Sequence, residues 1–159
     1  MKEQIIEAFV KVSLPKEVLT LLISMLPVVE LRGALPVAIT FFGFSWPKAY
    51  FLSVLGNMLP VLPFILFLHK FSDFLMKFSF FKKVLTWWFK RAEKHEALIQ
   101  RFEAIGLTLF VAIPLPVTGA WTACVIAYVF GIKKRYAFPA ILVGVMIAGA
   151  VVSFITVVV

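Results

Sequence analysis

The chain alternates apolar segments with shorter polar stretches, and four of the apolar segments are long enough to enter a membrane. Residues 47–69 and 136–158 each reach the length of about 20 residues that a helix needs to cross a bilayer. Residues 18–43 and 105–131 are interrupted near their centres, so each of their apolar halves is about half a span long. The pattern therefore predicts two transmembrane helices and two broken segments.

Both interruptions consist of residues that do not suit a plain helix in lipid. In the second broken segment they run from Pro114 to Gly119, and in the first they are Pro27, Glu30, Arg32, Gly33 and Pro36. Irregular backbone at membrane depth is tolerated only where protein or a water-filled cavity surrounds it. We therefore expect each broken segment to be a re-entrant hairpin that enters and leaves the membrane on one side.

Two more segments have amphipathic patterns. Residues 3–14 place Ile5, Phe9 and their apolar neighbours on one helical face, and the short length suits a helix lying in the membrane interface. Residues 70–103 interleave basic and aromatic side chains, and we interpret them as one or two helices on the membrane surface. A solvated linker with some helical content is the alternative for this second segment.

The two broken-segment-plus-span units resemble each other and indicate an internal repeat. In both units a second glycine follows the central glycine by 13 residues, and an alanine lies at the same position between the two glycines. The matched pairs are Gly43 with Gly131, Gly56 with Gly144, Ala49 with Ala137 and, with a two-residue gap, Gly33-Ala34 with Gly119-Ala120. Repeats of a broken helix followed by a span are typical of transporters.

Composition agrees with this pattern. The 159 residues are 62% hydrophobic, and the mean hydropathy is +1.02, whereas soluble domains are about 45–50% apolar. So small a chain cannot bury this much apolar surface in its own core. The predicted fold class is an all-α integral membrane protein of two inverted repeats, each a re-entrant helical hairpin followed by a transmembrane helix, with amphipathic interfacial helices.

The net charge of +8 is better explained by membrane topology than by nucleic acid, because the basic residues flank apolar segments. If both broken segments crossed fully, residues 70–103 and the Lys133-Lys134-Arg135 loop would lie on opposite sides. With re-entrant hairpins both basic stretches lie on the cytoplasmic side, as the positive-inside rule requires. The two hairpins then enter from opposite sides, so the repeats are inverted.

Enzyme chemistry has little support in the sequence. The two histidines, His69 and His95, have no metal-ligand spacing, and the single cysteine, Cys124, excludes an internal disulfide. No phosphate-binding loop or nucleophile motif is present. We therefore expect a protein that is not an enzyme and needs no cofactor or metal, with His69 as an interfacial anchor and His95 solvated.

Glu30 and Arg32 are the leading candidates for a substrate site. A charge at bilayer depth costs about 2.5–3.5 kcal/mol even on lenient insertion scales, so both side chains need a partner. Arg32 suits a phosphate or carboxylate, and Gly33 and Gly119 would begin half-helices whose N-termini attract anions. A carboxyl group away from water favours its neutral form, so Glu30 is the candidate proton carrier. An ion pair that only ties the hairpin together is the alternative.

Four more residues are candidates for contacts with a substrate. Thr118 and Thr122 could supply hydroxyl groups, and Trp121 could cover the site. Asn57 is an amide inside a span and could bridge it to a hairpin. For each of these residues, a hydrogen bond that holds helices together is an equally good interpretation.

Three motifs together resemble the small multidrug export protein family of bacteria and archaea over nearly the whole chain. They are residues 27–36 (PVVELRGALP), 56–60 (GNMLP) and 114–122 (PLPVTGAWT). The layout is more distantly similar to the DedA superfamily, whose two opposed re-entrant hairpins are implicated in proton-coupled lipid movement. That resemblance matches Glu30 to the acidic residue of the first hairpin. The second hairpin departs from the DedA pattern because residues 113–123 carry no charge.

Three functions are open at this point. The leading hypothesis is a transporter or flippase in a prokaryotic plasma membrane that moves an amphipathic, anionic substrate such as a phospholipid or polyprenyl phosphate. The first alternative is an exporter of cationic compounds, and the second is a membrane scaffold without transport. Expected partners are membrane lipids and a second copy of the chain, because the spacing of Gly144 and Gly149 suits a homodimer, and no nucleic acid.

Overall fold

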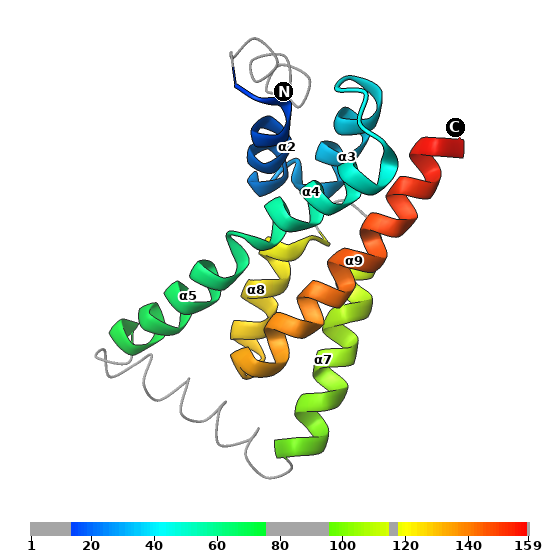
Figure 1. The fold of residues 1–159 in the computed structure, drawn as a ribbon. Helices are drawn as coiled ribbons and strands as arrows, with labels where there is room; N and C mark the ends of the chain where they lie inside the picture. Colours follow the sequence, from blue (N-terminus) through cyan, green and yellow to red (C-terminus); the bar gives the residue numbers. More distant parts are fainter. Residues whose placement is uncertain (1–13, 76–95, 115–117, 159) are drawn as a thin grey trace.

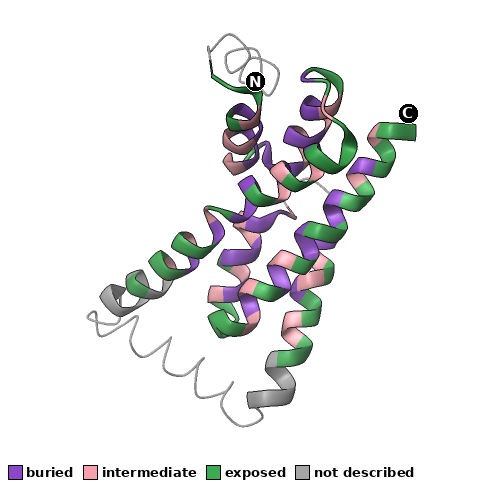
Figure 2. Cartoon of the chain, in the orientation of Figure 1, coloured by how far each residue is buried: buried purple, intermediate pink, exposed green. Residues whose placement is uncertain are grey.

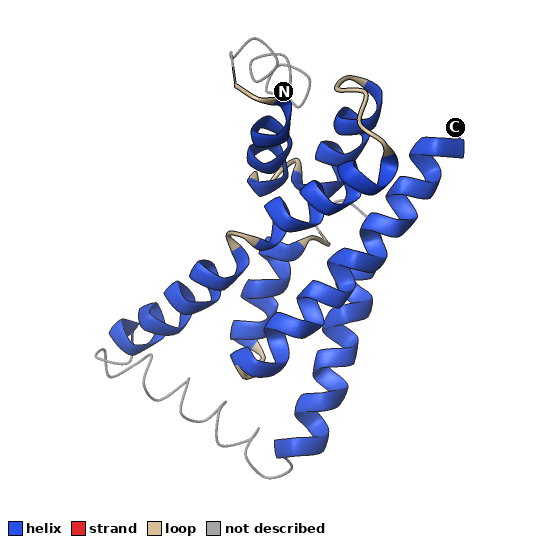
Figure 3. Ribbon diagram, in the orientation of Figure 1, coloured by secondary structure: helices blue, strands red, loops and turns tan. Residues whose placement is uncertain are grey.

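The computed structural model describes residues 14–75, 96–114 and 118–158, and every regular element in these ranges is a helix (Figure 3). This confirms the prediction of an all-α protein for the described residues. The predicted interfacial helix 3–14 and the centre of segment 70–103, with His95, lie outside them. The helices are α2 (Lys16–Met25), α3 (Glu30–Thr40), α4 (Trp46–Met58), α5 (Val61–Leu75), α7 (Glu96–Ala112), α8 (Ala120–Val129) and α9 (Lys134–Val158).

Helices α2 and α3 lie side by side as a hairpin at one end of the molecule, and α7 and α8 form a second hairpin at the other end (Figure 1). The end of α2 and the start of α8 both lie toward the middle of the molecule, and Arg32 of α3 hydrogen-bonds there to Thr118, just before α8. Helix α9 crosses the molecule obliquely and packs on α7 as well as on α3 and α4. The fold therefore brings the two interrupted stretches of sequence together.

Two regions are long and apolar enough to cross a membrane, Trp46–Leu68 and Lys134–Val158. The first comprises α4 and most of α5, with a turn at Leu59 and Pro60 where the proline cannot continue the hydrogen-bond ladder. The second is the single helix α9, which contains Pro139. These regions agree with the two predicted spans to within a few residues.

Large apolar side chains cover the outer faces of the helices, while buried residues gather where the helices face one another (Figure 2). Phe51, Phe67 and Phe154, which belong to the two long apolar regions, are 65%, 58% and 69% exposed. A water-soluble protein of this size does not expose so much contiguous apolar surface. The distribution indicates that lipid surrounds the helices.

The same glycine conformation ends α3 and α8. Gly43 and Gly131 have φ angles of 71° and 70°, a left-handed conformation that side chains disfavour. After Gly131, the Ile132 N–H donates to the Ala127 carbonyl at 2.8 Å, which is the long bond of a Schellman cap. Each glycine stops its helix and turns the chain toward the following span.

Glycines also set the closest helix contacts. A Cβ on Gly56 of α4 would lie 2.6 Å from the Leu21 carbonyl oxygen of α2. A Cβ on Gly144 of α9 would lie 2.6 Å from the Val111 Cβ of α7. Gly149 is likewise covered by Tyr50. Gly144 and Gly149, the two glycines whose spacing the sequence analysis linked to a homodimer, thus pack against other helices of the same chain.

Two helix boundaries differ from those expected for segment 70–103. Helix α5 extends to Leu75, beyond the expected end at residue 69, and α7 begins at Glu96 rather than near residue 105. Arg101 and Phe102 of α7 are exposed. A helix can continue from an apolar environment into water without losing its backbone hydrogen bonds, so the change from polar to apolar sequence does not mark its end.

Gly144→Ala is expected to lower the stability of the protein by about 1–3 kcal/mol, because the added methyl group must displace the backbone or a β-branched side chain of α7. Gly106→Ala in α7 is the matched control, since a Cβ added there would have no neighbour within 4 Å. Helix propensity should make that variant more stable by up to about 1 kcal/mol. Thermal unfolding in detergent measures both, and equal effects would contradict the α7–α9 packing.

Candidate functional site

The turn of the second hairpin leaves backbone groups exposed at two helix ends. Helix α7 ends at Ala112, and α8 begins at Ala120 after Gly119, which has no side chain to cap it. The last carbonyl groups of a helix and its first N–H groups lack partners within that helix. They carry partial negative and positive charge respectively. The hairpin therefore presents an acceptor end and a donor end close to each other.

Glu30 from the first hairpin contacts the donor end. A carboxylate oxygen of Glu30 accepts a long hydrogen bond of 3.5 Å from the Trp121 N–H, and the Ala120 N–H also donates to this carboxylate. The carboxylate lies directly against Gly119, where any Cβ would overlap both of its oxygens. Glu30 is 7% exposed. It caps α8 from another part of the chain and explains why residue 119 is a glycine.

Arg32 contacts the acceptor end. Its Nη2 donates to the Thr118 carbonyl at 2.7 Å, to the Thr118 hydroxyl at 3.0 Å and to the Ile113 carbonyl at 3.3 Å. The Thr118 hydroxyl in turn donates to the Ile113 carbonyl at 2.7 Å. The negative Glu30 thus contacts the positive N-terminus of α8, and the positive Arg32 contacts the negative carbonyl end of α7. We call these contacts of Glu30 and Arg32 with the second hairpin the tip contact.

The first hairpin supplies the pair through an unusual backbone conformation. Glu30 has a φ of 51°, a backbone angle that residues other than glycine rarely adopt. Its N–H donates to the Leu26 carbonyl at 2.8 Å, and helix α3 begins at Glu30 itself. The expectation that Gly33 begins this half-helix was therefore wrong. Gly33 lies in the first turn of α3, where a Cβ would overlap the Val29 side chain.

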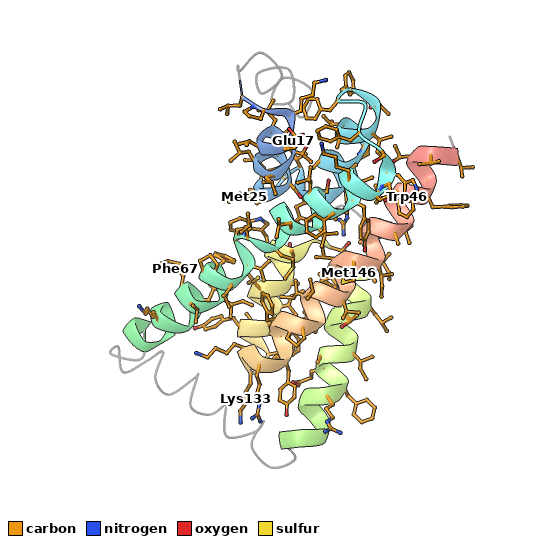
Figure 4. The ribbon with its side chains drawn as sticks, viewed as in Figure 1. Glu17, Met25, Trp46, Phe67, Lys133 and Met146 are labelled. Carbon is orange, nitrogen blue, oxygen red and sulfur yellow. The ribbon has the colours of Figure 1, made fainter. Side chains whose placement is uncertain are left out.

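Trp121 joins three elements beside the tip contact. Its indole Nε1 donates to the Met25 carbonyl at the end of α2, at 3.2 Å. Its ring packs on Phe64 of α5 with the ring centroids 4.8 Å apart. Figure 4 labels Met25 close to the centre of the molecule, where α2 ends. The indole therefore holds the turn of the first hairpin, as well as flanking the site.

A small cavity lies beside the charged pair. Its volume is about 10 Å³, near the lower limit for a single water molecule. Asn57 is 3% exposed, and its Oδ1 has no hydrogen-bond partner among the described residues. A buried carbonyl oxygen without a partner is costly and indicates a place for a polar ligand or water. The cavity is lined by Glu30, Leu31, Arg32, Asn57, Val111, Gly119, Ala120, Val145 and Ala148.

Most of the candidate residues from the sequence come together here. Glu30, Arg32, Asn57 and Gly119 line the cavity, and Thr118 and Trp121 bond to the first hairpin. Gly33 and Thr122 do not line it. Sequence reasoning missed Ile113 and Ala120, because they take part through backbone atoms that leave no signal in the residue type. No group of three metal-ligating side chains occurs in the described parts of the chain.

The match to a known family covers this site. A family model described as "Putative small multi-drug export protein" matches residues 30–151, beginning at Glu30 and containing the turn of the second hairpin. The chain belongs to this family. No curated protein and no solved structure matches it. The family description and the two long apolar helices together point to a membrane export protein.

Gly119→Ala is expected to lower stability by about 1–3 kcal/mol, because the new methyl group displaces the Glu30 carboxylate. In a Glu30→Ala background the same substitution should cost at least about 1 kcal/mol less, since residues in contact are not additive. Thermal unfolding of the four proteins gives this coupling energy.

The pair Gly106→Ala and Glu30→Ala is the control, because Gly106 has no neighbour within 4 Å of its added Cβ. Its two effects should add. If the stability changes of Glu30→Ala and Gly119→Ala were also additive, the two hairpins would not be in contact at these positions.

Proposed function

We propose that the protein is a transporter that moves an amphipathic anion, such as a phospholipid or a polyprenyl phosphate, across a bilayer. The substrate's charged group binds between two re-entrant hairpins near the midplane, and Glu30 carries the coupled proton. One observation carries this proposal: the Glu30 carboxylate occupies the N-terminus of α8, beside the Arg32 guanidinium. An internal carboxylate thus fills a site suited to a substrate anion.

Helix lengths support the re-entrant arrangement. Helices α2, α3 and α8 have 10, 11 and 10 residues, which correspond to about 15–17 Å. The hydrocarbon core of a bilayer is about 30 Å thick, so each helix reaches about half-way. The hairpins point toward each other from opposite ends of the molecule (Figure 1), which supports turns near the midplane.

The inverted repeat is supported by matched positions with matched roles. Gly43 and Gly131 both have positive φ angles after the second helix of a hairpin. Gly56 and Gly144 both lie where a span crosses the first helix of a hairpin. A shared role at equivalent positions is stronger support than aligned apolar letters, because apolar sequences align easily.

Charges at the two ends favour an orientation. The C-terminal end of α5, the N-terminal end of α7 and the labelled Lys133 all lie at one end of the molecule (Figure 4). At the other end Lys48 pairs with Glu17 at 2.6 Å, which balances its charge. The positive-inside rule then assigns the Lys133 end to the cytoplasm. This gives a multi-pass protein of the prokaryotic plasma membrane.

In this proposal, competition between the Glu30 carboxylate and the substrate phosphate couples proton binding to transport. A substrate phosphate and the Glu30 carboxylate need the same donors, namely Arg32 and the first N–H groups of α8. A proton on Glu30 removes its charge and weakens its hold on these donors. The cavity of about 10 Å³ is too small for a phosphate, so binding requires the hairpins to separate. The proton and the substrate thus favour the same open state.

Glu30→Gln is expected to abolish the pH dependence of transport, because the amide cannot ionise. Arg32→Lys should lower transport of a phosphorylated lipid about tenfold or more, since a charge-assisted hydrogen bond contributes about 1.5–3 kcal/mol. Movement of a fluorescent phosphatidylglycerol in proteoliposomes at several pH values measures both, because its phosphodiester keeps the same charge throughout.

Glu17→Gln at the far end removes the same charge as Glu30→Gln, so it serves as the charge-matched control and should transport like the wild type. If folded Glu30→Gln and Arg32→Lys proteins also transported every tested lipid like the wild type, at every pH, the proposal would be wrong.

A second candidate, export of cationic compounds, is supported by a separate acidic cavity. This cavity has a volume of about 250 Å³ and is lined by Glu103 and six apolar or glycine residues, including Phe110 and Phe130. The Glu103 Oε2 is buried without a hydrogen-bond partner among the described residues. Aromatic rings around a carboxylate suit a lipophilic cation.

Binding of a lipophilic cation at Glu103 should strengthen as pH rises. Burial raises the pKa of Glu103, so the ionised form that attracts a cation appears only above the usual range of a glutamate. Titration of tetraphenylphosphonium by calorimetry tests this, with Glu103→Gln expected to remove both the pH dependence and most of the affinity. Unchanged binding by Glu103→Gln would exclude this site.

A further inference from the structure

A large groove lies between the start of α4 and the end of α9. Its volume is about 640 Å³, in the range of sites for small molecules. Aromatic rings from both helices form its walls. It is lined by Trp46, Tyr50, Ala150, Ser153, Phe154, Val157 and Val158. Figure 4 labels Trp46 at this end of the molecule, beside the C-terminal part of α9.

One polar group in this apolar groove has no partner. Ser153 is 5% exposed, and its Oγ makes no hydrogen bond with the described residues. A serine inside a membrane helix ordinarily bonds to the carbonyl four residues earlier, as the Thr156 hydroxyl does with Val152. An unused hydroxyl at a groove wall indicates a ligand that carries a hydrogen-bond acceptor.

The groove adjoins the tip contact through a single layer of side chains. Gly149 separates the two, since a Cβ there would lie 2.8 Å from the Tyr50 ring and 3.2 Å from Leu31. Leu31 and Ala148 line the small cavity, whereas Tyr50 and Ala150 line the groove. The Tyr50 hydroxyl donates to the Met146 carbonyl at 2.9 Å, which holds the ring in this layer.

We infer that the α4–α9 groove binds the acyl chain of the transported anion, and that this anion is an acylglycerol phosphate whose ester carbonyl accepts a hydrogen bond from Ser153. The inference rests on the proposed function, because it takes the phosphate to bind at Glu30 and Arg32. Ser153 follows Ala148 by five residues, about 7.5 Å along the helix axis. A glycerol unit separates phosphate and ester carbonyl by a comparable span of bonds.

The aromatic walls of the groove are suited to the hydrocarbon chain of such a substrate. Trp46 and Phe154 present flat apolar surfaces to a hydrocarbon chain, and both helices that border the groove belong to regions able to cross a membrane. The chain can therefore remain in lipid while the head group moves between the hairpins. Loosely bound bilayer lipid would fill the same volume but would gain nothing from Ser153.

The test measures binding of two probes with the same chain to purified protein in nanodiscs. Oleoyl glycerol phosphate has the ester carbonyl, and oleyl phosphate lacks it. Ala150→Phe, at an exposed position on the groove wall, should weaken binding of both probes about tenfold or more by filling the groove. Ser153→Ala should weaken only the ester probe, by about fivefold, the worth of one hydrogen bond.

Val143→Phe is the matched control, since Val143 is 47% exposed on the same helix and does not line the groove. It should bind both probes like the wild type. If Ala150→Phe binds both probes like Val143→Phe, or if Ser153→Ala affects them equally, the inference is overturned and the groove holds bilayer lipid only.

A neutral probe separates this result from failure of the proposed function. Oleoyl glycerol shares the chain and the ester but has no phosphate, so it should bind at least about tenfold more weakly than its phosphate. Equal binding of the two by the wild type would contradict the anion site at Glu30 and Arg32. Unequal binding with no effect of Ala150→Phe would contradict only the groove.

Discussion

A broken helix in lipid must satisfy its free backbone groups from within the protein, and the tip contact is how this chain does so. The ends of α7 and α8 present carbonyl and N–H groups that have no partners within their own helices. Arg32 bonds to the carbonyl side, and Glu30 bonds to the N–H side. Neither charged side chain is stable in lipid alone, and neither helix end is stable without them. Each hairpin therefore completes the other.

This mutual dependence explains the small residues around the site. Gly119 must lack a side chain because the Glu30 carboxylate lies against it. Gly144 and Gly149 let α9 approach α7 and the layer of Tyr50 and Leu31, which brings the helix beside the cavity. Glu30, which makes the contact, has an unfavourable φ of 51°, and such conformations are often found at functional sites. The close packing at these glycines therefore helps to fix the positions of the Glu30 and Arg32 side chains.

The same contact accounts for a closed state in the proposed transport cycle. The donors that hold Glu30 are those that a phosphate would use, so the protein stabilises itself with an internal substitute for its proposed substrate. Interactions of this kind are lost and regained as a site opens, and a modest difference in free energy then decides the population of each state. Asn57, with an unpartnered oxygen in the cavity wall among the described residues, is placed to contact whatever enters first.

The sequence allowed much of this arrangement to be predicted, and its gaps have physical causes. Charge in an apolar segment identified Glu30 and Arg32, because lipid makes such residues costly, and the half-length apolar runs predicted hairpins. The start of α3 at Glu30 rather than Gly33 was missed, since a glutamate with positive φ is contrary to local preference. Partners that act through the backbone, as Ile113 and Ala120 do, carry no side-chain signal. The inward packing of Gly144 depends on α7, which is distant from it in sequence.

Labelling of single cysteines from each side of the membrane tests whether the two hairpins enter it from opposite sides. Single cysteines are placed at exposed positions near the two ends of each hairpin, away from its turn. These are Leu14 and Phe41 for the first hairpin and Phe102 and Phe130 for the second. The buried Cys124 is replaced by serine. A membrane-impermeant thiol reagent is added from one side of sealed vesicles at a time. We expect positions 14 and 41 to react from one side and positions 102 and 130 to react from the other. Labelling of the two flanks of either hairpin from opposite sides would mean that this segment crosses the membrane, and would contradict the account.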